Sequence, residues 1–303
     1  MNIVMTGSLG HVGKPLTEEL VRRGHRVTVV SSQARRRVEI EALGAQAATG
    51  TLEDREFLTA VFQDADAVFL LLAPGGAFTD PRIDLDAKFR EVGEACFGAI
   101  QASGVNRVVY LSSIGAHLPS GNGLLRLHHA MEARLDALNR VAVTFLRPTG
   151  FYTNLYAFVP MIQARGVIAA DYGAEVLEWV SPADIAVAAA EELEALGSGR
   201  PNPGARKVRY VASDELTGSQ TAAILGEAMG KPDLKWVVVP GDQVREGMVA
   251  AGMNPSIADA MVEMNAARVT GRLSEDYYRH RPVLGRVKMA EFAREFATAY
   301  RRT

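Results

Sequence analysis

The sequence predicts an α/β fold in which helices cover both faces of a doubly wound parallel sheet. Short apolar runs alternate with amphipathic helical segments through the first half of the chain. The first apolar run leads directly into a glycine-rich turn, residues 6–13, which a helical segment rich in Leu and Glu follows. The pattern changes after Pro148, where short strands and helices are interspersed. We therefore expect a parallel sheet followed by a smaller α+β lobe.

The elements of the first half follow from their apolar periodicity. The connections between parallel strands are nearly always right-handed, so these strands should form one sheet that binds ligands at its carboxyl edge. The expected strands are Ile3–Met5, Arg26–Val30, Ala67–Leu72, Arg107–Leu111 and Ala142–Leu146, and the expected helices are Pro15–Arg23, Arg55–Phe62, Leu85–Ala102 and Leu127–Leu138.

The second half is expected to form a substrate lobe. Its expected helices are Thr217–Met229 and Pro255–Ala267, its expected strands Lys207–Val211 and Lys235–Val239, and residues 197–205, rich in Gly and Pro, should form a loop. We place the nucleotide-binding domain at 1–154 and the substrate lobe at 155–303, with a return of the chain to the first sheet near 176–194.

The glycine-rich turn has the spacing of a dinucleotide-binding site. Gly7 allows a tight turn, Gly10 lets a pyrophosphate approach the backbone, and Gly13 lets the helix pack closely on the strand. The phosphates would lie at the helix N-terminus, where unpaired N–H groups and the helix dipole favour an anion. The residues predicted to bind the cofactor here are Gly7, Ser8, Leu9, Gly10, His11, Val12 and Gly13.

The end of the second strand indicates which cofactor is bound. Proteins that prefer NAD usually carry an acidic residue there, which accepts hydrogen bonds from the ribose hydroxyls. This chain has Ser31 and Ser32, followed shortly by three arginines that begin at Arg35. Hydroxyl and guanidinium groups can bind a 2′-phosphate that a carboxylate would repel, so we expect NADP(H), with NAD(H) as the alternative. The other interpretation is that the arginines only begin a solvated helix.

Composition excludes several classes of protein. The chain has 303 residues, is 48% hydrophobic and has a formal net charge of −2. A near-neutral chain lacks the concentrated basic face that nucleic acid requires. No apolar run approaches the ~18 residues of a membrane span, and the N-terminus lacks the pattern of a signal peptide, so we expect a cytoplasmic protein. Cys96 lies in a helical pattern and is interpreted as a buried, inert thiol.

The chain resembles the NmrA-like family of atypical short-chain dehydrogenases/reductases, and within it the NAD(P)H:quinone oxidoreductases. The resemblance extends over nearly the whole chain. The residues that carry it are Thr6–Gly13, Gly50–Asp54, Tyr110–Ala116, Leu146–Asn154, Trp179–Ala186 and Glu215–Gly218.

The resemblance implies further site residues. Ala73, Pro74 and Gly75 would lie beside the adenosine and its ribose, and Ser112 and Ser113 beside the nicotinamide ribose. The segment Pro148–Asn154, which includes Phe151, would line the nicotinamide and the substrate site, and Leu52 would also contact the cofactor. Many relatives have Arg directly after the second strand, where this chain has Ser31 and Ser32, and Asp where Thr51 stands. The chain therefore departs from the family pattern at positions that bear on the choice of cofactor.

The catalytic pair of ordinary short-chain dehydrogenases is missing. Those enzymes place Tyr and Lys four residues apart on one helix face, where the ammonium lowers the pKa of the phenol. No tyrosine here is followed by Lys at that spacing, and Leu125 and His129 occupy the expected places of the pair. We therefore do not expect an alcohol dehydrogenase or a sugar epimerase.

Reduction of a quinone or similar conjugated carbonyl remains compatible with the sequence, because positioning against the nicotinamide can suffice for an electrophilic acceptor. The candidate catalytic groups are His129, with His128 as its alternative, Tyr152 and Ser113. No metal site is expected, since the histidines are scattered. The second hypothesis is a redox sensor that binds NAD(P) without turnover and acts on a protein partner. A homo-oligomer is also compatible with the sequence.

Overall fold

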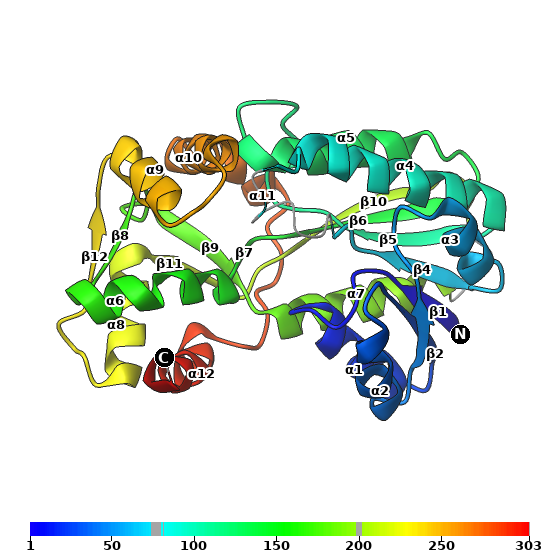
Figure 1. Cartoon of the computed structure of the whole chain (residues 1–303), viewed down its shortest axis with the longest axis horizontal. Helices are drawn as coiled ribbons and strands as arrows, with labels where there is room; N and C mark the ends of the chain where they lie inside the picture. Colours follow the sequence, from blue (N-terminus) through cyan, green and yellow to red (C-terminus); the bar gives the residue numbers. More distant parts are fainter. Residues whose placement is uncertain (74–79, 81, 198–201, 303) are drawn as a thin grey trace. The chain divides into compact units, whose positions relative to one another are not determined.

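The computed structural model describes residues 1–73, 80, 82–197 and 202–302 and divides into two compact units (Figure 1). Unit 1 consists of Met1–Ser113, Leu127–Arg147 and Ile185–Arg209, and unit 2 of Ile114–Arg126, Pro148–Asp184 and Tyr210–Thr303. The chain thus passes between the units several times. Each unit is described by itself below.

Unit 1 is built on a seven-stranded sheet. The pairs within β5-β4-β1-β2-β3 and between β5 and β6 are all parallel, and the order reverses beside β1, between β1 and β4. Such a reversal leaves a crevice at the carboxyl ends of the strands, where nucleotides bind. This architecture confirms the predicted doubly wound, Rossmann-type sheet. In spatial order the strands are β10 (Arg206–Val211), β6 (Ala142–Pro148), β5 (Arg107–Leu111), β4 (Ala67–Leu70), β1 (Asn2–Met5), β2 (Arg26–Ser31) and β3 (Gln46–Thr49).

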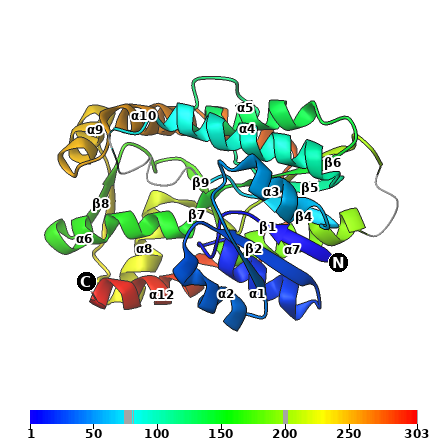
Figure 2. The same cartoon turned by 45° about the vertical axis from the view of Figure 1, so that its right-hand side comes forward.

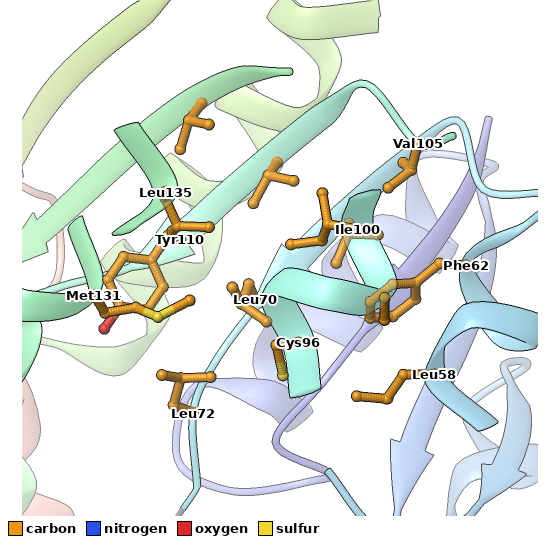
Figure 3. Close-up of a cluster of buried hydrophobic side chains, with 14 of the residues drawn as sticks. Leu58, Phe62, Leu70, Leu72, Cys96, Ile100, Val105, Tyr110, Met131 and Leu135 are labelled. Atoms are coloured by element: carbon orange, nitrogen blue, oxygen red, sulfur yellow. The ribbon is translucent and has the colours of Figure 1, made fainter. Parts of the chain in front are cut away.

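Helices cover both faces of this sheet (Figures 1 and 2). One face carries α3 (Arg55–Phe62), α4 (Leu85–Ser103) and α5 (Arg126–Asp136), and the other carries α1 (Gly13–Arg22), α2 (Arg37–Ala42) and α7 (Pro182–Gly197). Because both faces are covered, the central strands are continuously apolar, as in β4, where all four residues are buried. Figure 3 shows the core beneath α3, α4 and α5, formed by Leu58, Phe62, Leu70, Leu72, Cys96, Ile100, Val105, Tyr110, Met131 and Leu135.

Unit 2 contains two small sheets and six α-helices among its described residues. The three-stranded sheet has the order β11-β9-β7, and a two-stranded parallel sheet pairs β12 with β8. Its core includes Trp179, Trp236, Phe292 and Phe296. The bounds are β7 (Gly150–Phe151), α6 (Val159–Arg165), β8 (Val167–Ala170), β9 (Val176–Val180), β11 (Asp214–Thr217), α8 (Gly218–Met229), β12 (Lys235–Val238), α9 (Gly241–Ala250), α10 (Pro255–Val269), α11 (Glu275–Arg279) and α12 (Met289–Arg302).

The expected elements of unit 1 agree with the observed ones to within about two residues at most ends. None of the expected strand ranges includes β3, because Gln46–Thr49 has no large apolar side chain. Part of the expected loop at 197–205 lies outside the described residues. No helix in the described part of the chain is long and apolar enough to span a membrane.

Candidate functional site

The turn between β1 and α1 has the backbone that a phosphate site requires. Gly7 and Ser8 both have positive φ angles, 88° and 58°. A Cβ on Gly13 would lie 1.9 Å from the carbonyl oxygen of Ser8, so only glycine lets the helix approach the turn this closely. Val12 precedes α1 and supplies no side-chain hydrogen bond to its first turn. In that turn Lys14 N–H donates to the Gly10 carbonyl oxygen at 3.1 Å and Pro15 has no N–H group, so it is the helix dipole that favours an anion at this end.

Ser31, at the end of β2, is tied to this turn. The Ser8 hydroxyl donates to Ser31 Oγ at 3.0 Å, and the Gln33 N–H donates to the same oxygen at 3.2 Å. Ser31 is buried, whereas Ser32 is exposed. Of the two predicted serines, Ser31 is therefore the one that joins the turn between β1 and α1, called the phosphate turn below, to the end of β2.

Arg36 is the arginine that reaches the turn. Its Nη1 donates to the carbonyl oxygen of Leu9 at 2.9 Å, and its side chain is half-buried. Arg35, the residue predicted from the sequence, is exposed and donates from Nε to Gln33 Oε1 at 3.1 Å. Sequence reasoning missed Arg36 because three consecutive arginines do not reveal which one faces the turn.

The other predicted cofactor residues differ in accessibility. Gly10 and His11 are exposed at the turn, and a Cβ on Gly10 would have no heavy atom closer than 3.9 Å. Leu52 is partly buried against the core of unit 1, and Ala73 is exposed. Pro74 and Gly75 lie outside the described residues.

A buried ion pair supports the ends of β5 and β6. Arg147 donates to both oxygens of Glu132, from Nε at 2.9 Å and from Nη2 at 2.5 Å, and the two side chains are only 8% and 9% exposed. Ser112 also donates its hydroxyl to Glu132. The hydrogen bond to Glu132 thus fixes the Ser112 side chain, which is buried, while the neighbouring Ser113 is half-buried. Of the two serines, Ser113 has the more accessible side chain.

The adjacent histidines of α5 have different surroundings. His128 Nδ1 and the Tyr110 hydroxyl share a hydrogen bond of 2.8 Å, and the ring of Phe89 packs edge-on against His128. Burial lowers the pKa of His128 to about 4, so this ring is neutral near pH 7. His129, the predicted candidate, is half-buried. A neutral His128 is a poor general acid at that pH.

The residues predicted from Pro148–Asn154 belong to unit 2. Pro148 is buried, and its carbonyl oxygen accepts a hydrogen bond from Ile114 N at 2.9 Å. Phe151 is half-buried in β7, beside Val180 of β9. Tyr152 is fully buried, and its hydroxyl donates to Asp214 Oδ2 at 2.6 Å. Burial and this carboxylate raise the pKa of Tyr152.

The described residues contain no group of three or more His, Cys, Asp or Glu side chains that could hold a metal ion. Burial raises the pKa of the Cys96 thiol to about 12, so it is not a nucleophile at neutral pH.

Comparison with known proteins identifies the family. The NAD(P)H-binding family model matches residues 7–195, more than half of the chain. The chain belongs to this family. The match begins at the glycine-rich turn, includes β2 to β6 of the seven-stranded sheet and extends through most of α7, so it confirms the predicted nicotinamide cofactor.

Two curated relatives match over most of their length. The chain is 26% identical to an NAD(P)H azoreductase of Xenophilus azovorans, over 98% of this chain and 99% of that protein. It is 27% identical to a (4-alkanoyl-5-oxo-2,5-dihydrofuran-3-yl)methyl phosphate reductase of Streptomyces griseus, over 89% of this chain and 88% of that protein. Both are reductases, and at this level the prediction of an NAD(P)H-dependent oxidoreductase is confirmed.

Solved structures share the fold. An NADPH-dependent quinone oxidoreductase from Escherichia coli, complexed with NADPH, superposes with a TM-score of 0.78 at 21% identity, over 97% of this chain and 99% of that chain. The triphenylmethane reductase of Citrobacter sp., complexed with NADP(H), gives a TM-score of 0.73 at 19% identity, over the same shares of the two chains. The finer assignment to the NmrA-like subgroup stays a prediction.

Proposed function

We propose that the protein is a reductase that prefers NADPH and transfers hydride to a quinone or similar conjugated acceptor. The observation that carries the proposal is the phosphate turn, with its positive-φ backbone and uncapped helix, tied to Ser31 and Arg36 at the end of β2. A hydroxyl and a guanidinium there suit a 2′-phosphate. The E. coli and Citrobacter structures that share the fold hold NADPH or NADP(H), which supports the same choice.

In this proposal, different residues of the chain bind different parts of the cofactor. The N-terminus of α1 holds the pyrophosphate, and Ser31 and Arg36 hold the 2′-phosphate. The cofactor, when bound, supplies the hydride. Ser113, at the carboxyl end of β5, contacts the nicotinamide half, because that half extends from the switch point toward β4 and β5.

The proton that accompanies the hydride comes from water or from His129 or Ser113. Tyr152 is assigned a supporting role, because its hydroxyl is already donated to Asp214 and its pKa is raised. His128 is the weaker candidate, because burial lowers its pKa to about 4 and a neutral imidazole donates a proton less readily than an imidazolium.

The test is oxidation of NADPH and NADH, followed by loss of the reduced-nicotinamide absorbance, with benzoquinones, naphthoquinones and an azo dye as acceptors. Turnover with NADPH preferred is the expected result. Binding of NADPH without turnover on any acceptor would contradict the reductase. Replacement of His129 by Ala in the same assay assigns the proton donor, since unchanged turnover removes His129 from the mechanism.

A redox sensor is the second candidate function. It is favoured by one observation, the absence of the Tyr-x-x-x-Lys pair. A sensor must bind oxidised and reduced cofactor with different affinities, since only a differential interaction shifts a conformational equilibrium. Titration with all four cofactor forms checks this, and equal affinities for oxidised and reduced forms would exclude it.

A further inference from the structure

One residue at the carboxyl end of the unit 1 sheet is bonded to two other elements of that unit. Ser112 directly follows β5, and its N–H donates to the carbonyl oxygen of Leu146 in β6 at 2.8 Å. Its hydroxyl donates to Glu132 of α5. Ser112 is thus joined by its backbone to the neighbouring strand and by its side chain to a helix that covers the sheet.

The carboxyl group of Glu132 accepts three hydrogen bonds. Oε1 accepts from Ser112 and from Arg147 Nε at 2.9 Å, and Oε2 accepts from Arg147 Nη2 at 2.5 Å. A guanidinium stays charged when it is buried, so Arg147 requires an acceptor such as Glu132. The two bonds from Arg147 meet this requirement without Ser112. The bond from Ser112 is therefore additional, and it is the one that connects Glu132 to the end of β5.

Ser113, the next residue, is the first one after β5 with an accessible side chain. Leu111 and Ser112 are buried, whereas Ser113 is half-buried. The ladder between β5 and β6 ends at the pair Leu111 and Leu146, so strand pairing does not extend to Ser113. The position of Ser113 consequently depends on how firmly Ser112 is fixed. Ser113 is also the residue that the proposed function places against the nicotinamide half of the cofactor.

We propose that Glu132 is a positioning residue of the nicotinamide site. Through its hydrogen bond with Ser112 it fixes the end of β5, and thereby the place of Ser113 against the nicotinamide half. Glu132 is itself buried and is assigned no contact with cofactor or acceptor. The proposal rests on the proposed function and deepens it, because it names the group that orients the reacting end of the cofactor.

Loss of this hydrogen bond should affect only one half of the cofactor. The pyrophosphate and the 2′-phosphate are assigned to the phosphate turn and to Ser31 and Arg36, none of which bonds to Ser112 or Glu132 in the described structure. A less firmly fixed Ser113 should therefore weaken the binding that the nicotinamide half contributes. It should also slow hydride transfer, because small displacements of reacting groups lower rates steeply.

The experiment titrates the full chain with NADPH and with adenosine 2′,5′-bisphosphate, which lacks the nicotinamide half, in the absence of any acceptor. Ser112→Ala should weaken the binding of NADPH about fivefold and that of the bisphosphate by less than about twofold, and Glu132→Gln should show the same pattern. The matched control is Thr144→Val, which removes another buried hydroxyl of unit 1 that donates to a buried glutamate, Glu192. It should leave both affinities unchanged.

The double variant Ser112→Ala/Glu132→Gln shows whether the two residues act through the same bond. Its NADPH affinity should fall no further than that of the weaker-binding single variant, because two changes at one bond are not additive. Ser112→Ala leaves the Arg147–Glu132 pair intact, so it keeps the test available even if Glu132→Gln does not fold. Melting temperatures of all variants show which of them are folded.

Three results would overturn the proposal. They are an unchanged NADPH affinity in Ser112→Ala, equal losses for NADPH and the bisphosphate, which a general loosening of the fold would produce, and additive losses in the double variant. With an acceptor that the wild type reduces, Ser112→Ala should also lower kcat about tenfold. Failure on every acceptor would count against the reductase, whereas the titrations would still test the role of Glu132.

Discussion

At the scale of single residues, Arg36 is the side chain that we propose sets the preference for NADPH. Its contact with the Leu9 carbonyl oxygen holds the guanidinium at the phosphate turn. Arg36→Ala should lower kcat/KM for NADPH by about 10- to 100-fold, because a hydrogen bond to a charged phosphate is lost, and should leave the value for NADH nearly unchanged. Arg35→Ala, at the exposed neighbour, should have a smaller effect on both. Equal losses for NADPH in the two variants would contradict the assignment.

The contribution of the buried Arg147–Glu132 pair to the free energy of unfolding can be tested by replacing Glu132. Replacement by Gln leaves Arg147 buried with a weakened partner and releases Ser112, so the free energy of unfolding should fall by about 3 kcal/mol. The control is Glu94→Gln. Glu94 of α4 pairs with Arg134, which lies in α5 as Glu132 does, but the side chains of this pair are 48% and 36% exposed. That change should cost less than about 1 kcal/mol. Urea unfolding measures both, and similar losses would show that burial of the pair adds nothing.

At the scale of elements, the junction of β1 and α1 predicts opposite roles for two glycines. Gly13→Ala places a methyl group against the Ser8 carbonyl oxygen and should cost at least about 2 kcal/mol. Gly10→Ala meets no close neighbour, so stability should change by less than about 0.5 kcal/mol. Its methyl group would occupy the approach of the pyrophosphate, so NADPH affinity should fall about tenfold or more. Melting temperatures and cofactor titrations measure these effects, and a Gly10→Ala variant that binds like the wild type would contradict the placement of the pyrophosphate.

At the scale of the whole molecule, the sequence predicted those features that depend on residues close together in the chain. Apolar runs and the glycine spacing located most of the sheet and the phosphate turn, because those features depend on residues a few positions apart. The contacts of Ser112 with Glu132 and of Tyr152 with Asp214 join residues distant in the sequence, and only tertiary packing brings them together. The sequence did carry one signal of such a contact: Arg147 is the only charged residue of β6, a strand buried throughout, where a charge requires a buried partner.

Stability in acid is a property of the whole chain that His128 should influence. Burial lowers its pKa from 6.5 to about 4, so between these values the unfolded chain binds a proton that the folded chain does not. The free energy of unfolding should therefore fall as pH drops through this window, by about 2 to 3 kcal/mol from this group.

The variant His128→Gln tests this, because it keeps a hydrogen-bonding partner for Tyr110 but has no group that titrates. Urea unfolding from pH 7 to about pH 4 should thus show a flatter dependence in His128→Gln than in the wild type. His280→Gln, at an exposed histidine, should retain the wild-type slope, and an unchanged slope in His128→Gln would mean that His128 is not held neutral by the fold.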